Sequence, residues 1–163
     1  MGRLDGYLND HLAGSAAAIQ LVQRCWARQP ESELGRVLRV LLGEIEEDRR
    51  VLEHVIGALG GSANPLKRAG ALGVELLSSL RMALPILGAG AAEAARLEEI
   101  EVLSLGIEGK RLLWAALGTL ATSDARLQRF DFAALQRRAK AQRDRLERYR
   151  LELAAAAMRN GVG

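Results

Sequence analysis

The chain has 163 residues, of which 49% are hydrophobic, 26% charged and 4% aromatic, and its formal net charge is +3. This is the composition of a soluble globular protein, and we expect one domain over residues 1–163. A single cysteine, Cys25, excludes an intrachain disulfide framework and suits the reducing cytoplasm, where we expect the protein. The N-terminus lacks the apolar segment of a signal peptide, and the uncharged stretch 82–92 is too short to span a bilayer.

Two long helices are predicted in the first third of the chain. Apolar side chains recur at steps of three and four over residues 3–28 and 30–59, the spacing of one helical face. Pro30 ends the first helix and starts the second, because its fixed φ suits a first-turn position. Gly60 and Gly61 end the second helix. So short a link predicts that the two helices pack as an antiparallel hairpin.

Three more helices are predicted downstream. Asn64 caps a short helix over 65–81, and a long helix follows over 91–120. After a turn, Asp131 caps the last helix, which runs to about residue 159. The chain therefore reads as two long hairpins joined by about thirty residues, a length that suits a crossover along a bundle.

Over nearly its whole length the chain resembles the ferritin-like superfamily. The resemblance lies in the order and lengths of the helices and in a long connection between the second and third long helices that carries its own short helix. The resemblance implies an all-α fold, an up-down four-helix bundle with a short extra helix in the crossover. Ferritin-like di-metal proteins place one Glu on each of two helices and a Glu-x-x-His pair on each of the other two. This sequence contains no Glu-x-x-His, so the resemblance implies a divergent member with a degenerate inner site.

Polar residues interrupt the apolar faces of the long helices. Asp48 falls on the apolar face of the second helix, where a carboxylate is costly unless a partner answers its charge. Counting helix positions from the predicted turns puts His11 and Glu108 level with Asp48, and Glu44 one turn away. The inward face of the first helix is predicted to hold Leu4, Leu8, His11, Ser15, Ala18 and Val22. That of the second is predicted to hold Leu38, Leu41, Ile45, Asp48, Leu52, Val55 and Leu59.

These inward polar residues suggest a metal site. An imidazole with two or three carboxylates suits iron, manganese or zinc, and a transition metal is the candidate cofactor. The candidate ligands are His11, Glu44, Asp48 and Glu108, with Glu101, Gln142 and Tyr149 around them. The alternative is a polar network without metal, in which His11 and Asp48 satisfy one another and help to fix the helix register. No catalytic residue is assigned, because neither a Ser-His-Asp nor a Cys-His order can be found.

The segment 124–152 carries most of the positive charge. It holds nine Arg or Lys residues and five acids, a net +4, which leaves −1 for the rest of the chain. A cationic helix can bind phosphates, but no base-reading motif accompanies this one and aromatic residues are few. A nucleic-acid partner is therefore not expected. The alternative is that the arginines meet Glu46, Glu47 and Glu53 of the second helix, within the fold or across a dimer.

One principal functional hypothesis and two alternatives follow. The principal hypothesis is a non-catalytic scaffold or oligomeric interaction module. The first alternative is a metal-binding protein with redox or oxygen-linked activity. The second is binding of nucleic acid or an anionic surface through the Arg-rich last helix. A homodimer is expected, because the helix over 65–81 and the stretch 82–92 would otherwise expose a large apolar surface.

Overall fold

The computed structural model describes residues 2–63 and 91–160, which form four long helices and no strand. The elements are α1 (Arg3–Ala27), α2 (Glu33–Ala58), α4 (Ala91–Ala121), the short 3-10 helix η2 (Ala125–Leu127) and α5 (Phe132–Asn160). The predicted all-α class is confirmed for this part of the chain. The predicted helix over 65–81 lies outside the described residues, as does most of the stretch 82–92.

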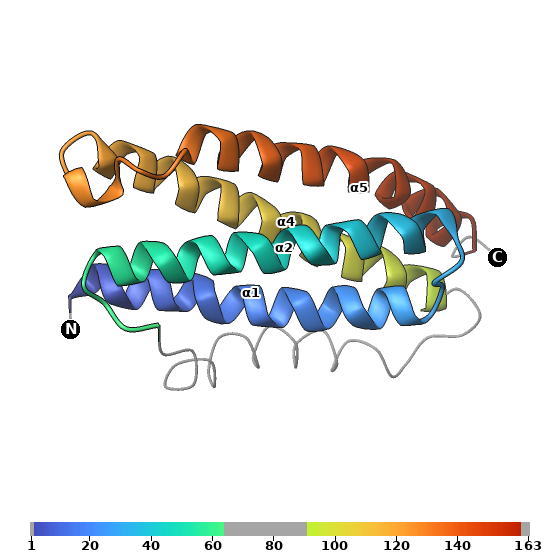
Figure 1. Cartoon of the computed structure of the whole chain (residues 1–163). Coiled ribbons are helices and arrows are strands. Elements are labelled where there is room, and N and C mark those ends of the chain that lie inside the picture. The colour runs from blue at the N-terminus through green and yellow to red at the C-terminus, as the bar shows by residue number, and fades with distance from the viewer. Residues whose placement is uncertain (1, 64–90, 161–163) are drawn as a thin grey trace.

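The four long helices lie side by side as two antiparallel pairs (Figure 1). α1 packs against α2, and α4 packs against α5. The pairs meet through contacts of α1 with α4 and of α2 with α5. α2 and α4 run in the same direction along the bundle (Figure 1). The interior therefore lies between the two hairpins and is lined by all four helices.

The second helix begins at Glu33, so the predicted start at Pro30 is wrong. Ser32 is the N-cap, and its hydroxyl oxygen accepts a hydrogen bond from the Gly35 N–H at 2.9 Å. A serine hydroxyl satisfies a first-turn N–H that has no partner inside the helix. Pro30 instead belongs to the turn that precedes this cap.

The link between α4 and α5 is held by two aspartates. The Asp124 carboxylate accepts the N–H of Arg126 at 3.1 Å, and that of Asp131 accepts the N–H of Ala134 at 2.8 Å. Leu127, which is fully buried, anchors the link in the core. The prediction that Asp131 caps the last helix is confirmed.

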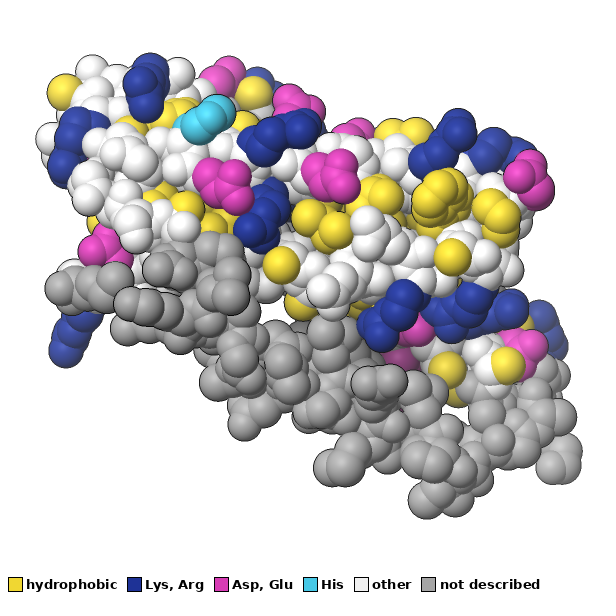
Figure 2. Space-filling model, turned by 60° about the horizontal axis from the view of Figure 1, so that its bottom comes forward, with side chains coloured by type: hydrophobic (Ala, Val, Ile, Leu, Met, Phe, Trp, Pro, Cys, Tyr) yellow, Lys and Arg dark blue, Asp and Glu magenta, His cyan; other side chains and the backbone are white. Residues whose placement is uncertain are grey.

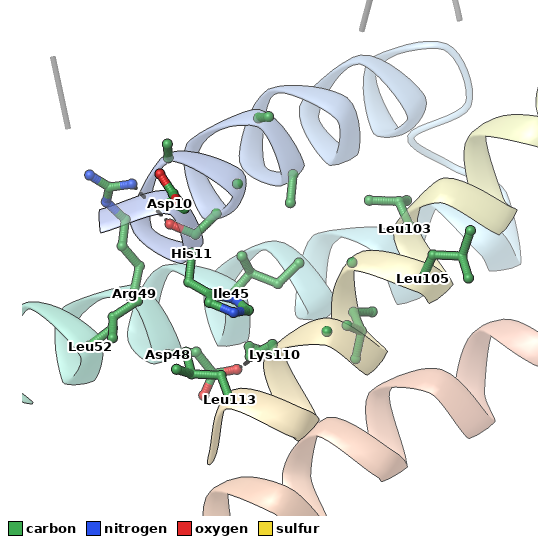
Figure 3. Close-up of a pocket in the computed structure, with 18 of the residues that line it drawn as sticks. Asp10, His11, Ile45, Asp48, Arg49, Leu52, Leu103, Leu105, Lys110 and Leu113 are labelled. Atoms are coloured by element: carbon green, nitrogen blue, oxygen red, sulfur yellow. Dashed lines mark hydrogen bonds and ion pairs between the residues drawn. The ribbon is translucent and has the colours of Figure 1, made fainter. Parts of the chain in front are cut away.

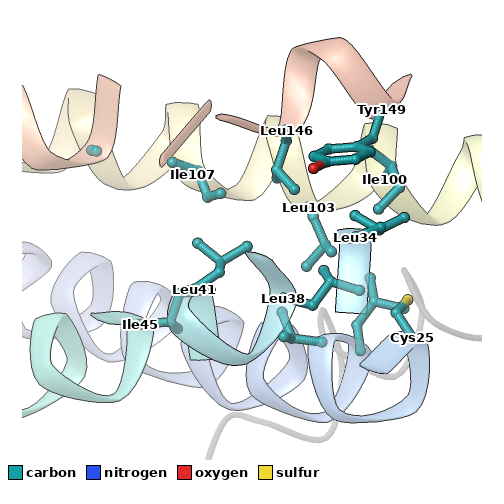
Figure 4. Close-up of a cluster of buried hydrophobic side chains, with 13 residues drawn as sticks. Cys25, Leu34, Leu38, Leu41, Ile45, Ile100, Leu103, Ile107, Leu146 and Tyr149 are labelled. Carbon is teal, nitrogen blue, oxygen red and sulfur yellow. The ribbon is translucent and has the colours of Figure 1, made fainter. Parts of the chain in front are cut away.

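Buried apolar side chains form two clusters. The first (Figure 4) includes Cys25, Leu34, Leu38, Leu41, Ile45, Ile100, Leu103, Ile107, Leu146 and Tyr149. The second includes Leu8, Leu12, Leu52, Val55, Ile56, Leu113, Trp114, Leu117, Leu127, Phe132 and Leu135. α2 and α4 pass from one cluster to the other at Asp48 and Lys110, so polar residues lie at the boundary.

Burial confirms six of the seven positions predicted for the inward face of α2. Leu59, the C-cap residue, is only half-buried. The predicted face of α1 is partly wrong. Leu4 is 40% exposed and His11 and Ser15 are half-buried, whereas Leu12 is fully buried. α1 packs against α2 and α4 together, so its buried face is turned from the one that sequence spacing alone predicts.

Acidic and basic side chains are interspersed on the face shown in Figure 2, and apolar side chains are exposed between them. Leu105 and Met158 are the most exposed large apolar residues of the described part, at 71% and 70%. Within the described residues, no helix has the length and apolar character that a bilayer crossing requires.

Candidate functional site

A layer of polar side chains crosses the interior at the boundary between the two clusters. We call Asp48, Lys110, Arg138 and Gln142 the polar layer. Lys110 Nζ donates to Asp48 Oδ2 at 2.5 Å and to Gln142 Oε1 at 2.6 Å (Figure 3 shows the first contact). Gln142 Nε2 donates to Asp48 Oδ2 at 3.2 Å, and Arg138 donates to Asp48 Oδ1. Both carboxylate oxygens therefore accept from other helices.

The centre of the polar layer is deeply buried, and the charges of the layer are balanced once Glu47 is counted with them. Asp48 is 2% exposed and Gln142 is fully buried. Arg138 also pairs with Glu47 at 3.2 Å, so two cations face two carboxylates. Burial lowers the pKa of Lys110, and the neighbouring Asp48 carboxylate opposes that shift. A buried charge is tolerated when it is paired in this way.

The structure pairs the predicted carboxylate ligands with arginines. Glu44 forms an ion pair with Arg145. Glu108 pairs with Arg111 of its own helix and with Arg143 of α5, each at 2.6 Å. The hydrogen bond from Arg111 is the main reason that the pKa of Glu108 is lowered. Neither glutamate is part of the polar layer.

His11 lies beside the polar layer rather than within it. Its ring meets Tyr7 edge to face, with centroids 4.7 Å apart and an interplanar angle of 77°. Burial lowers the pKa of His11, and the charge of Asp10 partly offsets this. Both oxygens of Asp48 are occupied by Lys110 and the two α5 side chains, so Asp48 is satisfied without the imidazole.

The three residues predicted around the metal have separate environments. Glu101 pairs with Arg150 at 3.3 Å. Gln142 belongs to the polar layer. Tyr149 packs in the first apolar cluster, and burial raises its pKa.

Within residues 2–63 and 91–160, no three His, Cys, Asp or Glu side chains gather in a way that could hold a metal ion. A metal at Asp48, Glu44 or Glu108 would have to displace a protein cation from the carboxylate. The metal site stays a prediction.

Sequence reasoning missed Lys110 and Arg138. A signal for Lys110 was present, because it lies three residues after Ile107 and four before Trp114, on the apolar face of α4. Arg138 gives a weaker signal, since it is half-buried and its guanidinium reaches the interior from the edge of the α5 face.

A cavity of about 500 Å³ lies beside the polar layer, between α1, α2 and α4 (Figure 3). His11 contributes to its wall from α1, Asp48 and Arg49 from α2, and Lys110 from α4. Most of the remaining wall is apolar or glycine. The polar layer thus forms one side of a space that is otherwise mainly apolar.

The chain matches none of the protein-family models, curated proteins or solved structures with which it was compared.

Proposed function

We propose that this protein is a non-catalytic helical-bundle scaffold or oligomeric interaction module, in which the polar layer has a structural role. The observation that supports this most directly is the pairing of Asp48, whose two oxygens accept from Lys110, Arg138 and Gln142. Because this carboxylate already accepts hydrogen bonds from three protein side chains, a metal ion would have to compete with them for its oxygens. We also propose that the bundle is a divergent ferritin-like one, on the basis of the order and direction of its long helices.

The physical role of such a layer is to select one helix register. Apolar contacts alone discriminate weakly between registers one turn apart. Moving α4 along α2 by one turn would separate Lys110 from Asp48 and leave the Lys110 ammonium buried without its counter-charge. That arrangement costs several kcal/mol, so the paired register is favoured.

The stability test uses three variants. Asp48→Leu leaves Lys110 buried without its counter-charge and is expected to lower the free energy of unfolding by about 3–5 kcal/mol. Adding Lys110→Met and Gln142→Leu removes the stranded groups and is expected to restore most of that loss. Glu44→Gln is the control, since it breaks a more exposed ion pair and should cost less than about 1 kcal/mol. Urea unfolding measures all three.

A triple variant as unstable as Asp48→Leu alone would show that the layer does more than balance its own charges.

The same preparations test the metal alternative. Protein purified without chelator and supplemented with iron, manganese and zinc is expected to hold substoichiometric metal by elemental analysis. One metal ion per chain, lost in Asp48→Leu, would favour the metal-binding alternative.

The interaction role has its own measurement. Sedimentation velocity over a concentration series is expected to show a dimer or higher oligomer. A chain that remains monomeric at all concentrations would reject self-association and leave a scaffold for other partners.

A further inference from the structure

The helix α4 is apolar on two opposite sides. Its inner side holds Ile107 and Trp114, which are buried in the bundle. Leu105 and Leu112 each lie two residues before one of these, and two residues turn a helix by about 200°. They therefore project away from the bundle, and they are 71% and 53% exposed. A helix that is apolar on both its inner and its outer side is typical of one that is covered on both.

The outer side of α4 carries a regular pattern of large and small residues. We call Leu105, Gly109, Leu112 and Ala116 the outer face of α4. Their spacing of four, three and four residues is that of a face that packs along a second helix. Gly109 is half-buried, and a Cβ added to it would meet nothing within 4 Å. Each leucine of the outer face is thus followed by a residue that leaves space above the helix.

This pattern is complementary to itself in one orientation. In an antiparallel pair of α4 helices, a twofold axis between positions 110 and 111 sets Leu112 of one copy level with Gly109 of the other. The same axis sets Leu105 level with Ala116. Each leucine then faces a small residue, which is how packed helices interdigitate. A parallel pair in register would instead set leucine against leucine and glycine against glycine.

The charges beside the outer face are complementary in the same orientation. Glu108 and Arg111 lie toward one edge of it and pair with each other at 2.6 Å, with side chains that are 27% and 32% exposed. A twofold axis brings the same edge of both copies together. Glu108 of one copy then lies within about 3 Å, measured along the helix axis, of Arg111 of the other. Both residues can therefore form ion pairs across the interface.

We propose that two copies of this chain associate through the outer faces of α4 in antiparallel orientation. The inference rests on the oligomeric role proposed above and names the surface that performs it. An unrelated partner would have to reproduce both the fit of leucine on glycine and the order of the charges. A second copy of α4 supplies both through symmetry.

The first experiment is sedimentation velocity of the full chain over a concentration series. Leu112→Glu places a carboxylate against Gly109 of the second copy and is expected to weaken dimerisation more than about tenfold. Its melting temperature at low concentration should change little, since Leu112 is 53% exposed within one chain. Leu151→Glu is the matched control on α5, at a leucine that is 54% exposed and lies outside the outer face.

The outcomes separate this inference from the role on which it rests. Leu151→Glu should dimerise like the wild type. A dimer that persists in Leu112→Glu would use another surface, which would overturn the inference and leave the oligomeric role standing. A wild-type chain that stays monomeric would overturn both.

Gly109→Leu tests the fit of the two faces. It fills the space that receives Leu112 and also makes the face more apolar. Non-specific apolar adhesion would therefore become stronger, whereas interdigitation should become about fivefold weaker or more. Gly43→Leu is the control on α2, also with open space around its Cβ, and should dimerise like the wild type. Equal or stronger association of Gly109→Leu would contradict the proposed orientation.

Charge exchange tests the pairing of Glu108 with Arg111. Glu108→Arg alone brings arginines together across the interface, and Arg111→Glu alone brings glutamates together. Each is expected to weaken dimerisation about five- to thirtyfold, since two exposed pairs change sign. An equimolar mixture of the two variants restores opposite charges at both positions and should dimerise about as well as the wild type. A mixture no better than its components would reject the pairing.

Thiol labelling separates a second copy from coverage by the same chain. The cysteine of Leu112→Cys is expected to react slowly with a maleimide at high protein concentration and faster after dilution. Wild-type protein is the control, because its Cys25 is 3% exposed. A rate that does not depend on concentration would overturn the proposal, and a slow one would mean that residues 64–90 cover the outer face.

Discussion

His11 illustrates how one side chain can combine two environments. Its ring packs against Tyr7 and lines a mainly apolar cavity, and the negative charge of the exposed Asp10 raises its pKa. Burial is the larger effect, so the folded state favours the neutral imidazole.

This shift predicts a pH dependence of stability. Because the pKa of His11 is lower in the folded than in the unfolded chain, the unfolded chain binds more protons as the pH falls below about 6.5. The contribution of His11 to stability is present above that value and is lost as the pH falls through its folded pKa. His11→Gln should therefore lose less stability than the wild type between roughly pH 7.5 and pH 5.

Urea unfolding across that pH range checks the prediction. Asp10→Asn is the companion variant: it removes the charge that raises the pKa of His11, so its stability should fall more steeply with acid than that of the wild type. If His11→Gln and the wild type lost the same free energy of unfolding on acidification, the imidazole of His11 would not be the buried group responsible.

Cys25 is also defined by its surroundings. Its thiol donates to Glu99 at 3.5 Å, and burial together with this carboxylate raises its pKa to about 11. A thiol that stays protonated near neutral pH is a poor nucleophile, so Cys25 acts as a core residue.

At the scale of elements, the start of α2 depends on close backbone packing. Gly35 is buried, and a Cβ there would lie 2.0 Å from the Gln29 carbonyl oxygen and 2.8 Å from that of Pro30. The turn from α1 folds back over the first turn of α2, where only a glycine leaves room for it. The Ser32 cap depends on the same approach, since its hydroxyl also donates to the Gln29 carbonyl at 2.8 Å.

Two glycine-to-alanine changes on α2 should therefore have opposite signs. Gly43→Ala, in open space, should raise the free energy of unfolding by about 0.5–1 kcal/mol. Gly35→Ala should lower the free energy of unfolding, because moving the turn away from the new methyl group costs more than the higher helix propensity of alanine contributes. Thermal or urea unfolding measures both. Stabilisation by Gly35→Ala would mean that the turn can move freely.

At the scale of the whole molecule, α5 joins the two hairpins through charge. Its arginines pair with acids of both neighbouring helices: Arg145 with Glu44 of α2, and Arg150 with Glu101 of α4. Such exposed pairs each contribute little, about 0–1 kcal/mol. Their joint effect is to neutralise part of the basic segment locally.

Removing those acids should expose the cationic helix. The triple variant Glu33→Gln, Glu44→Gln, Glu101→Gln frees Arg148, Arg145 and Arg150 from these partners and changes the net charge from +3 to +6. It should bind a random DNA duplex several-fold tighter than the wild type at low salt, and added salt should weaken this binding.

The matched control is Asp10→Asn, Glu53→Gln, Glu98→Gln, which also reaches +6 but changes no acid with an observed α5 partner. Fluorescence anisotropy compares the two. If the two variants bound DNA with equal affinity, the gain in affinity would come from total charge, and a specific role for the arginines of α5 would be rejected.

The sequence by itself determined the four long helices of the described residues, apart from the start of α2, most of the inward face of α2, and the Asp131 cap. These are local properties: a helical period repeats within one segment, and a cap needs only its own first turn. The sequence also allowed us to predict that α2, α4 and α5 meet near the middle of the bundle, because helix lengths fix the position of a residue along the bundle axis to within about one turn.

Which side chains meet there was decided by the tertiary structure. Each residue turns a helix by about 100°, so Glu108 and Lys110, two residues apart, face different neighbours. The rotation of α1 and α4 about their own axes depends on packing against all partners at once, and it placed Lys110 on Asp48 and His11 at the cavity wall.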